Sequence, residues 1–195
     1  MATLSDKVAA SGDDGWSRDN GDYQPADTNT YAGYLGGVMS TWLRFAGVDF
    51  TVLAGAAINT ASITIYFAGT GNGNPLTKLY AEDAPSPAAP TSRADHTGKT
   101  RTTAGVDWDG DPDPPSGGSV QSPDIASVIQ ELADSYTPTV IQILHDDDGS
   151  DIGASNNMRY DVYDNDTLEA ADLDIDYTAA GGTIRRYSLP LMGAG

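Results

Sequence analysis

The sequence predicts an all-β fold: an antiparallel β-sandwich or jelly roll with one short helix and an extended C-terminal tail. Three observations predict it. Short apolar segments alternate with polar residues, 22 glycines and 11 prolines supply turns between them, and only one segment has helical spacing. The chain has 195 residues, which suits one domain. We therefore expect a sandwich domain over residues 1–178 and a C-terminal arm over residues 179–195.

The clearest strand prediction covers residues 58–67 (INTASITIYF). Ile63, Ile65 and Phe67 are expected to face the core, because apolar residues at every second position occupy one side of a strand. The polar first 36 residues predict one or two short strands. Further strands are expected around residues 30–35, 39–45, 76–82, 100–108, 140–144, 158–163 and 173–178.

Loops and one helix separate these strands. Residues 84–90 (APSPAAP) are too rich in proline for a central strand, and residues 109–118 form a second long, acidic loop. Residues 122–135 predict the helix, capped by Ser122 or Asp124, because apolar residues recur there at spacings of three and four.

The charge balance restricts the classes of partner. The chain has 28 acidic and 10 basic residues, a formal net charge of −18. Phosphate backbones and anionic lipids repel such a surface, so we expect neither nucleic acid nor a membrane as a partner. Calcium ligation or a saline habitat each accounts for the abundance of aspartate.

The N-terminal residues lack a basic start followed by an apolar run, which argues against a secretory signal. The chain also has no cysteine, so thiol and zinc–thiolate chemistry are excluded. We expect a protein made in the cytoplasm.

Two aspartate clusters have the ligand type that calcium prefers. Asp107 and Asp109 belong to one cluster, and Asp146 and Asp148 belong to the other. Prolines and a missing twelfth-position glutamate exclude an EF-hand. Two interpretations stay open, an irregular sandwich-type calcium site and solvated turns.

Aromatic residues and histidines give the remaining candidate sites. Trp16 and Trp108 lie in loop-like sequence and are candidates for stacking on glycans, with core packing as the alternative. His96 is expected in a polar loop and His145 at a strand end. No nucleophile-elbow motif accompanies them, and paired carboxylates are uninformative in so acidic a chain. We therefore expect no enzymatic activity.

The tail (TIRRYSLPLMGAG, residues 183–195) combines basic and apolar residues. Terminal segments are commonly frayed, but this one is also suited to dock on an acidic neighbouring subunit. The expected partner-binding residues are Ile184, Arg185, Arg186, Tyr187, Leu189, Leu191 and Met192.

The order of segments resembles the DNRLRE-type β-sandwich modules and related jelly-roll proteins of tailed viruses and phages. Each segment is a weak pattern, and their order between about residues 38 and 178 carries the resemblance. The matching segments are 42–45 (WLRF), 54–67, 79–92, 101–108 (RTTAGVDW), 122–132 (SPDIASVIQEL), 140–150 (VIQILHDDDGS), 159–164 (RYDVYD) and 173–177.

The resemblance implies a carbohydrate-binding-module-like fold and two functions. The first is a non-enzymatic virion protein, a capsid decoration or cement subunit that bridges shell subunits. Its partners would be the major capsid protein or other virion subunits. We expect a homo-oligomer, with a trimer favoured because a trimer suits capsid symmetry. The second is a stand-alone carbohydrate-binding module that attaches to cell-surface glycans.

Overall fold

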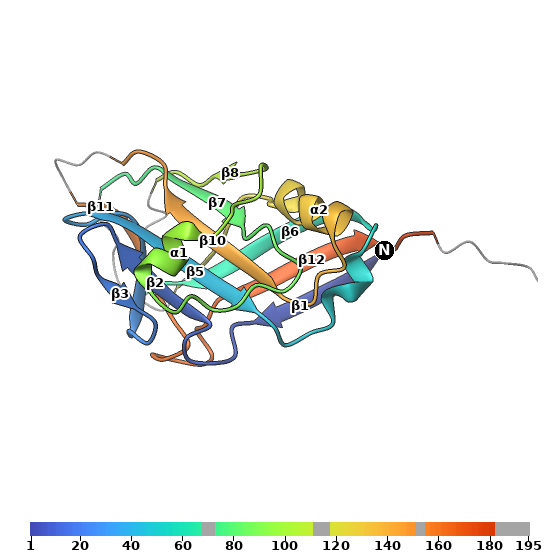
Figure 1. The fold of residues 1–195 in the computed structure, drawn as a ribbon, viewed down its shortest axis with the longest axis horizontal. Helices are drawn as coiled ribbons and strands as arrows, with labels where there is room; N and C mark the ends of the chain where they lie inside the picture. Colours follow the sequence, from blue (N-terminus) through green and yellow to red (C-terminus); the bar gives the residue numbers. More distant parts are fainter. Residues whose placement is uncertain (68–72, 111–117, 151–154, 182–195) are drawn as a thin grey trace, which may run out of the picture.

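Twelve strands and two helices make up the described part of the chain (Figure 1). In this computed structural model, the described residues are 1–67, 73–110, 118–150 and 155–181. The strands are β1 (Ala2–Lys7), β2 (Asp14–Arg18), β3 (Tyr23–Gln24), β4 (Asn29–Tyr34), β5 (Val38–Phe45), β6 (Ala57–Tyr66), β7 (Thr77–Ala81), β8 (Val106–Asp107), β9 (Ser119–Gln121), β10 (Ile141–Asp147), β11 (Asn156–Asp161) and β12 (Asp172–Thr178). The helices are α1 (Arg93–Gly98) and α2 (Ala126–Ser135), with a 3-10 turn at Phe50–Leu53.

The strands form two antiparallel sheets. The smaller sheet has the order β1-β12-β6-β9, and β1 is an edge strand. The larger sheet follows the path β11-β4-β5-β10-β7-β8, with β2 paired to β5 and β3 to β2. The two sheets pack against each other around one apolar core, so the predicted antiparallel sandwich is confirmed.

The core follows the predicted alternation. Ile63, Ile65 and Phe67 are fully buried, and Leu173 and Ile175 of β12 face the same interior. Leu43, Phe45, Ile141 and Ile143 supply the opposing layer from β5 and β10. Burial of such side chains contributes on the order of 1.5–3 kcal/mol each to folding.

Helix α2 begins four residues later than expected. Pro123 and Asp124 precede it, and the Asp124 carboxylate accepts from the backbone N–H of Ala126, the first helical residue. The same carboxylate also accepts from the N–H of Ala61 in β6. Asp124 thus holds the helix start against the smaller sheet, which is why these residues do not continue the helix.

Three expectations were wrong in detail. The first 36 residues contain four strands instead of one or two, because β1 pairs with β12 and β2 pairs with β5. The strand expected over residues 100–108 is reduced to the two residues of β8 and one bridge between Glu82 and Arg101. Helix α1 lies where a loop was expected.

Helix α1 has a local cause. The Ser92 hydroxyl accepts from the backbone N–H of Asp95, which satisfies an otherwise unpaired donor at the helix start. The helix places His96 in the interior, completely buried. Among the described residues, no helix has the length and apolar character that a membrane-spanning segment requires.

Candidate functional site

The four candidate calcium ligands form ion pairs with two cationic side chains or accept a hydrogen bond from the backbone. Lys78 of β7 lies between β8 and β10, and its ammonium group is 2.7 Å from Asp107 and 3.5 Å from Asp148. Arg101 pairs with Asp146 at 2.9 Å. Asp109 accepts from the backbone N–H of Thr77 at 3.1 Å.

The structure therefore brings Asp107 and Asp148 together around a lysine. In the described ranges, no group of three or more histidine or acidic side chains is arranged to hold a metal ion. Asp147, a further member of the second cluster, accepts from the backbone N–H groups of Gly149 and Ser150. Asp111, Asp113 and Asp151, which also belong to the two sequence clusters, lie outside the described ranges. Asp107, Asp148 and Asp146 therefore neutralise Lys78 and Arg101, and Asp109 holds the backbone of Thr77.

Trp16 and Trp108 are packing residues in this structure. Trp16 belongs to β2, is 8% exposed and donates from Nε1 to Asp27. Trp108 is 6% exposed and stacks on His145 with ring centroids 5.3 Å apart. The loop-like sequence around both residues suggested accessible indole faces, but Tyr31 packs against Trp16 and His145 packs against Trp108. The packing alternative is the one that the structure supports.

Both histidines are interior residues, which corrects the expectation of a loop and a strand end. Strand β10 continues through His145, because Thr41 of β5 and Leu79 of β7 pair with it on both sides. Nε2 of His145 lies 2.8 Å from the Thr77 hydroxyl, and Nδ1 of His96 lies 2.8 Å from the Ser17 hydroxyl. Desolvation by burial is the main cause that lowers the pKa of each histidine to about 4.

Each hydroxyl–histidine pair has the composition of a catalytic nucleophile and its general base, but neither pair is accessible from solvent. All four side chains are at most 2% exposed. A general base must come within hydrogen-bond reach of a substrate. The pairs therefore connect secondary-structure elements: Ser17 and His96 connect strand β2 to helix α1, and Thr77 and His145 connect strand β7 to strand β10.

The outer face of the smaller sheet carries an ordered polar surface. Asp172, Asp174 and Asp176 alternate along β12 with core residues, so all three carboxylates lie on the face away from the core. We call them the aspartate row. They are flanked by the outward residues of β1 on one side (Thr3, Ser5, Lys7) and of β6 on the other (Thr60, Ser62, Thr64).

Contacts across the strands hold the aspartate row in place. Thr3 donates to Asp176 at 2.5 Å, Ser5 donates to Asp174, and Lys7 pairs with Asp172 at 3.1 Å. The sequence prediction used the apolar half of the pattern DLDIDYT for the core. The aspartates in between were a signal that it did not use.

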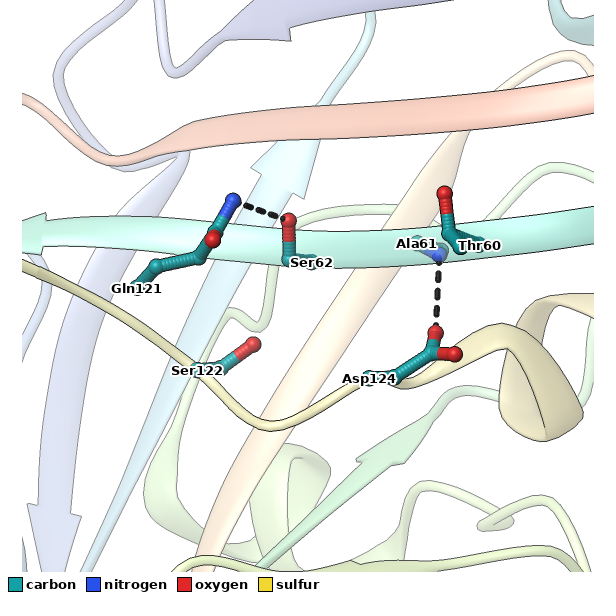
Figure 2. A pocket seen from close by; sticks show the side chains of 6 residues that line it. All are labelled: Thr60, Ala61, Ser62, Gln121, Ser122 and Asp124. Carbon is teal, nitrogen blue, oxygen red and sulfur yellow. Dashed lines mark hydrogen bonds between the residues drawn. The ribbon is translucent and has the colours of Figure 1, made fainter.

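A polar pocket opens beside the same sheet, between β6 and the segment that connects β9 to α2 (Figure 2). Its volume is about 290 Å³, and Gln121 donates to Ser62 at its rim. Asp124 lies at the other end, where it accepts from Ala61. The lining residues are Thr60, Ala61, Ser62, Gln121, Ser122 and Asp124. Hydroxyl, amide and carboxylate groups of this kind are suited to hydrogen bonding with a small polar ligand.

The predicted partner-binding residues, from Ile184 to Met192, lie outside the described residues. Residues 178–181, which lead toward them, are all exposed. No protein-family model matches the chain, and no curated protein matches it.

Proposed function

We propose that this protein is a non-enzymatic structural subunit of a tailed-virus particle, a capsid decoration or cement protein that bridges shell subunits. Its partners would be the major capsid protein or other virion subunits, and it would act as a homo-oligomer, with a trimer favoured. The observation that carries the proposal is the outer face of the smaller sheet. It is an extended, polar, strand-built surface next to the point where the chain leaves for its basic C-terminal segment.

Two features support a structural role over catalysis. The hydroxyl–histidine pairs are buried, so they are suited to hold strands together and not to reach a substrate. The sandwich is built from long-range strand pairing: β1, at residues 2–7, pairs with β12, at residues 172–178. A sandwich held together in this way is suited to connect neighbouring subunits rigidly.

The charge and the resemblance narrow the partner. A net charge of −18 disfavours nucleic acid and anionic membranes, which leaves protein surfaces as the favoured partner. The order of the sequence segments between residues 38 and 178 resembles that of modules found in small virion proteins. That resemblance is the reason for placing the protein on a virus particle.

The experiment is immunogold labelling of tailed-virus particles purified from the source culture, with antibodies raised against this chain. Labelling distributed over the capsid surface is the expected result, with pre-immune serum as the control. Particles that carry no chain, by labelling and by mass spectrometry of their proteins, would contradict the proposal. Labelling restricted to the tail would reject the capsid position.

A second candidate, glycan attachment, is favoured by the pocket in Figure 2. Its volume of about 290 Å³ and its hydroxyl and amide lining suit a monosaccharide unit better than the two buried tryptophans do. The test is a glycan array probed with the wild type and with Gln121→Ala. Binding that the substitution weakens at least tenfold would favour this candidate, and an array without binding would reject it.

A further inference from the structure

We propose that the aspartate row is the docking surface for the C-terminal segment, residues 183–195, of a second copy of this chain. Arg185 and Arg186 of one copy would pair with Asp174 and Asp176 of the other. The inference rests on the assembly role proposed above and names the surface that this role would use.

The aspartate row has unused capacity for cations. Asp172 already pairs with Lys7. Asp174 and Asp176 accept hydrogen bonds from Ser5 and Thr3, but no described lysine or arginine forms an ion pair with either. An ionised carboxylate has about four lone-pair sites, so one hydroxyl donor leaves room for a guanidinium group.

The spacing of Asp174 and Asp176 is within the reach of two arginine side chains. Residues two apart on a strand point to the same face, about 6.6–6.8 Å apart. Asp174 and Asp176 have this spacing and lie opposite Ser62 and Thr60 of β6. Arg185 and Arg186 are consecutive, so in an extended segment their side chains would point to opposite sides. A segment lying edge-on along the row would direct one guanidinium group toward each carboxylate.

The C-terminal segment holds the cations that the described body does not use. Of the ten lysines and arginines, Arg185 and Arg186 lie outside the described residues. Six of the other eight form ion pairs with carboxylates: Lys7, Arg18, Arg44, Lys78, Lys99 and Arg101. Arg93 donates to a backbone carbonyl and Arg159 to Asn29. Arg185 and Arg186 are therefore the complementary charges for an acidic face.

The path of the chain favours a second copy over the chain's own face. Strand β12 delivers the chain to the end of the sheet, beside the N-terminus, and the last described residues continue away from the body (Figure 1). A Cβ added at Gly181 would meet no atom within 4 Å. From Thr178, the seven residues to Arg185 span at most about 25 Å when extended, enough to reach an adjacent molecule.

Each exposed ion pair contributes only about 0.2–1 kcal/mol. Reciprocal exchange between copies in a closed assembly repeats the contact in every copy and raises the effective concentration of each arm. Because the contacts are exposed charge pairs, the assembly is expected to weaken as ionic strength rises.

Charge exchange between two full-length variants tests the inference. The face variant carries Asp174→Arg with Asp176→Arg, and the arm variant carries Arg185→Glu with Arg186→Glu. A third variant, Asp174→Asn with Asp176→Asn, removes the charge but keeps acceptors for Ser5 and Thr3. The control is Asp19→Arg with Asp134→Arg, two exposed positions outside the smaller sheet. Circular dichroism checks the fold of each, and light scattering at low salt gives the mass.

We expect the wild type and the control to have at least twice the monomer mass of 20.3 kDa. All three other variants are expected to be monomers. An equimolar mixture of the face and arm variants is expected to assemble above the monomer mass with an even number of copies, because a closed trimer of two variants would contain one like-charged contact. A monomeric wild type, an assembled face variant or a mixture that stays monomeric would overturn the inference.

The outcome separates this inference from the proposed function. Assembly that depends on the arm but survives the face substitutions rejects the aspartate row and leaves the virion proposal standing. Assembly rescued by mixing, together with virus particles that lack the chain, supports the docking surface and rejects the virion proposal.

Discussion

Trp108 and His145 stack nearly parallel inside the sandwich, with ring centroids 5.3 Å apart and an interplanar angle of 14°. The Thr77 hydroxyl connects them, because it donates to the Trp108 carbonyl and lies 2.8 Å from Nε2 of His145. Its single proton is used in the first contact, so Nε2 of His145 is the donor in the second. Nδ1 is then free to accept from the hydroxyl of Tyr160 at 3.3 Å.

This network requires a neutral His145 and makes the fold sensitive to acid. Burial lowers the pKa of His145 from 6.5 to about 4, so between these values the unfolded chain binds a proton that the folded chain does not. The stability that neutral His145 contributes is therefore complete above pH 6.5 and falls toward pH 4, by about 1.4 kcal/mol per pH unit.

The variant His145→Gln removes this titration and keeps an amide that can donate and accept. Urea denaturation between pH 4.5 and 7 is expected to show a variant less stable than the wild type at pH 7, with the difference narrowing as the pH falls. A difference that does not depend on pH would show that His145 does not contribute to acid sensitivity.

Asp14 has the opposite pH dependence. Burial is the main cause that raises the pKa of this carboxyl from 3.8 to about 7, and the charges of Asp164 and Asp13 add to the shift. The folded chain holds the proton more tightly, so the stability contributed by Asp14 is complete below pH 3.8 and is lost as the pH rises through 7.

Asp14→Asn is therefore expected to gain stability relative to the wild type between pH 4 and 7. The amide oxygen keeps the acceptor for the backbone N–H of Tyr163, which lies 2.8 Å from the carboxylate. Asp19→Asn removes an exposed carboxylate and is the control for loss of charge. If both variants differ from the wild type by the same amount at each pH, the buried carboxyl of Asp14 is not the cause.

Gly33 allows β4 to approach β11 closely. Its φ is +106°, and a Cβ at this position would overlap the carbonyl oxygen of Asn156 and lie 3.2 Å from Pro75. Gly33→Ala is expected to lower the free energy of unfolding by about 3 kcal/mol or more, from strain and steric overlap together.

Gly21→Ala is the matched control for that substitution. Gly21 has a similar φ of +112°, but no atom lies within 4 Å of a Cβ placed there. It therefore carries the backbone strain alone, on the order of 1–3 kcal/mol. Equal losses in urea denaturation of the two variants would show that contact with β11 is unimportant.

The response to ions separates calcium binding from general screening. Asp107 and Asp148 pair with Lys78, and Asp146 pairs with Arg101, so we expect a chelator to leave the melting temperature unchanged. Sodium chloride up to molar concentration is expected to raise it gradually by screening a net charge of −18. Stabilisation that saturates at low calcium would instead indicate a specific site.

The core could be predicted from the sequence where burial alternates locally. The pattern around Ile63 and Ile65 needs no knowledge of the partner strand, because the period of two is itself the signal. Strand β2 lacks this signal: its sequence is DGWSR, and all residues but Arg18 are buried because β5 and α1 cover them. Tertiary pairing produced that strand.

The candidate sites were harder to predict because exposure depends on neighbours distant in sequence. Trp108 follows a two-residue strand and precedes an acidic stretch, which is typical of a surface loop, yet His145 covers its ring. The helix around His96 did have a local signal in Ser92 and Asp95. The aspartate row could have been predicted from residues 172–178, because the aspartates there alternate with the apolar residues that predicted the core.

The solution mass of the full chain, measured beside that of a chain that ends at Thr178, tests whether this protein is an assembly subunit. We expect an oligomer for the full chain, a trimer if capsid symmetry governs it, and a monomer for the shortened chain. Two monomers would contradict the assembly role, and glycan attachment would then be the better supported function. Two oligomers of the same order would contradict only the role of the C-terminal segment.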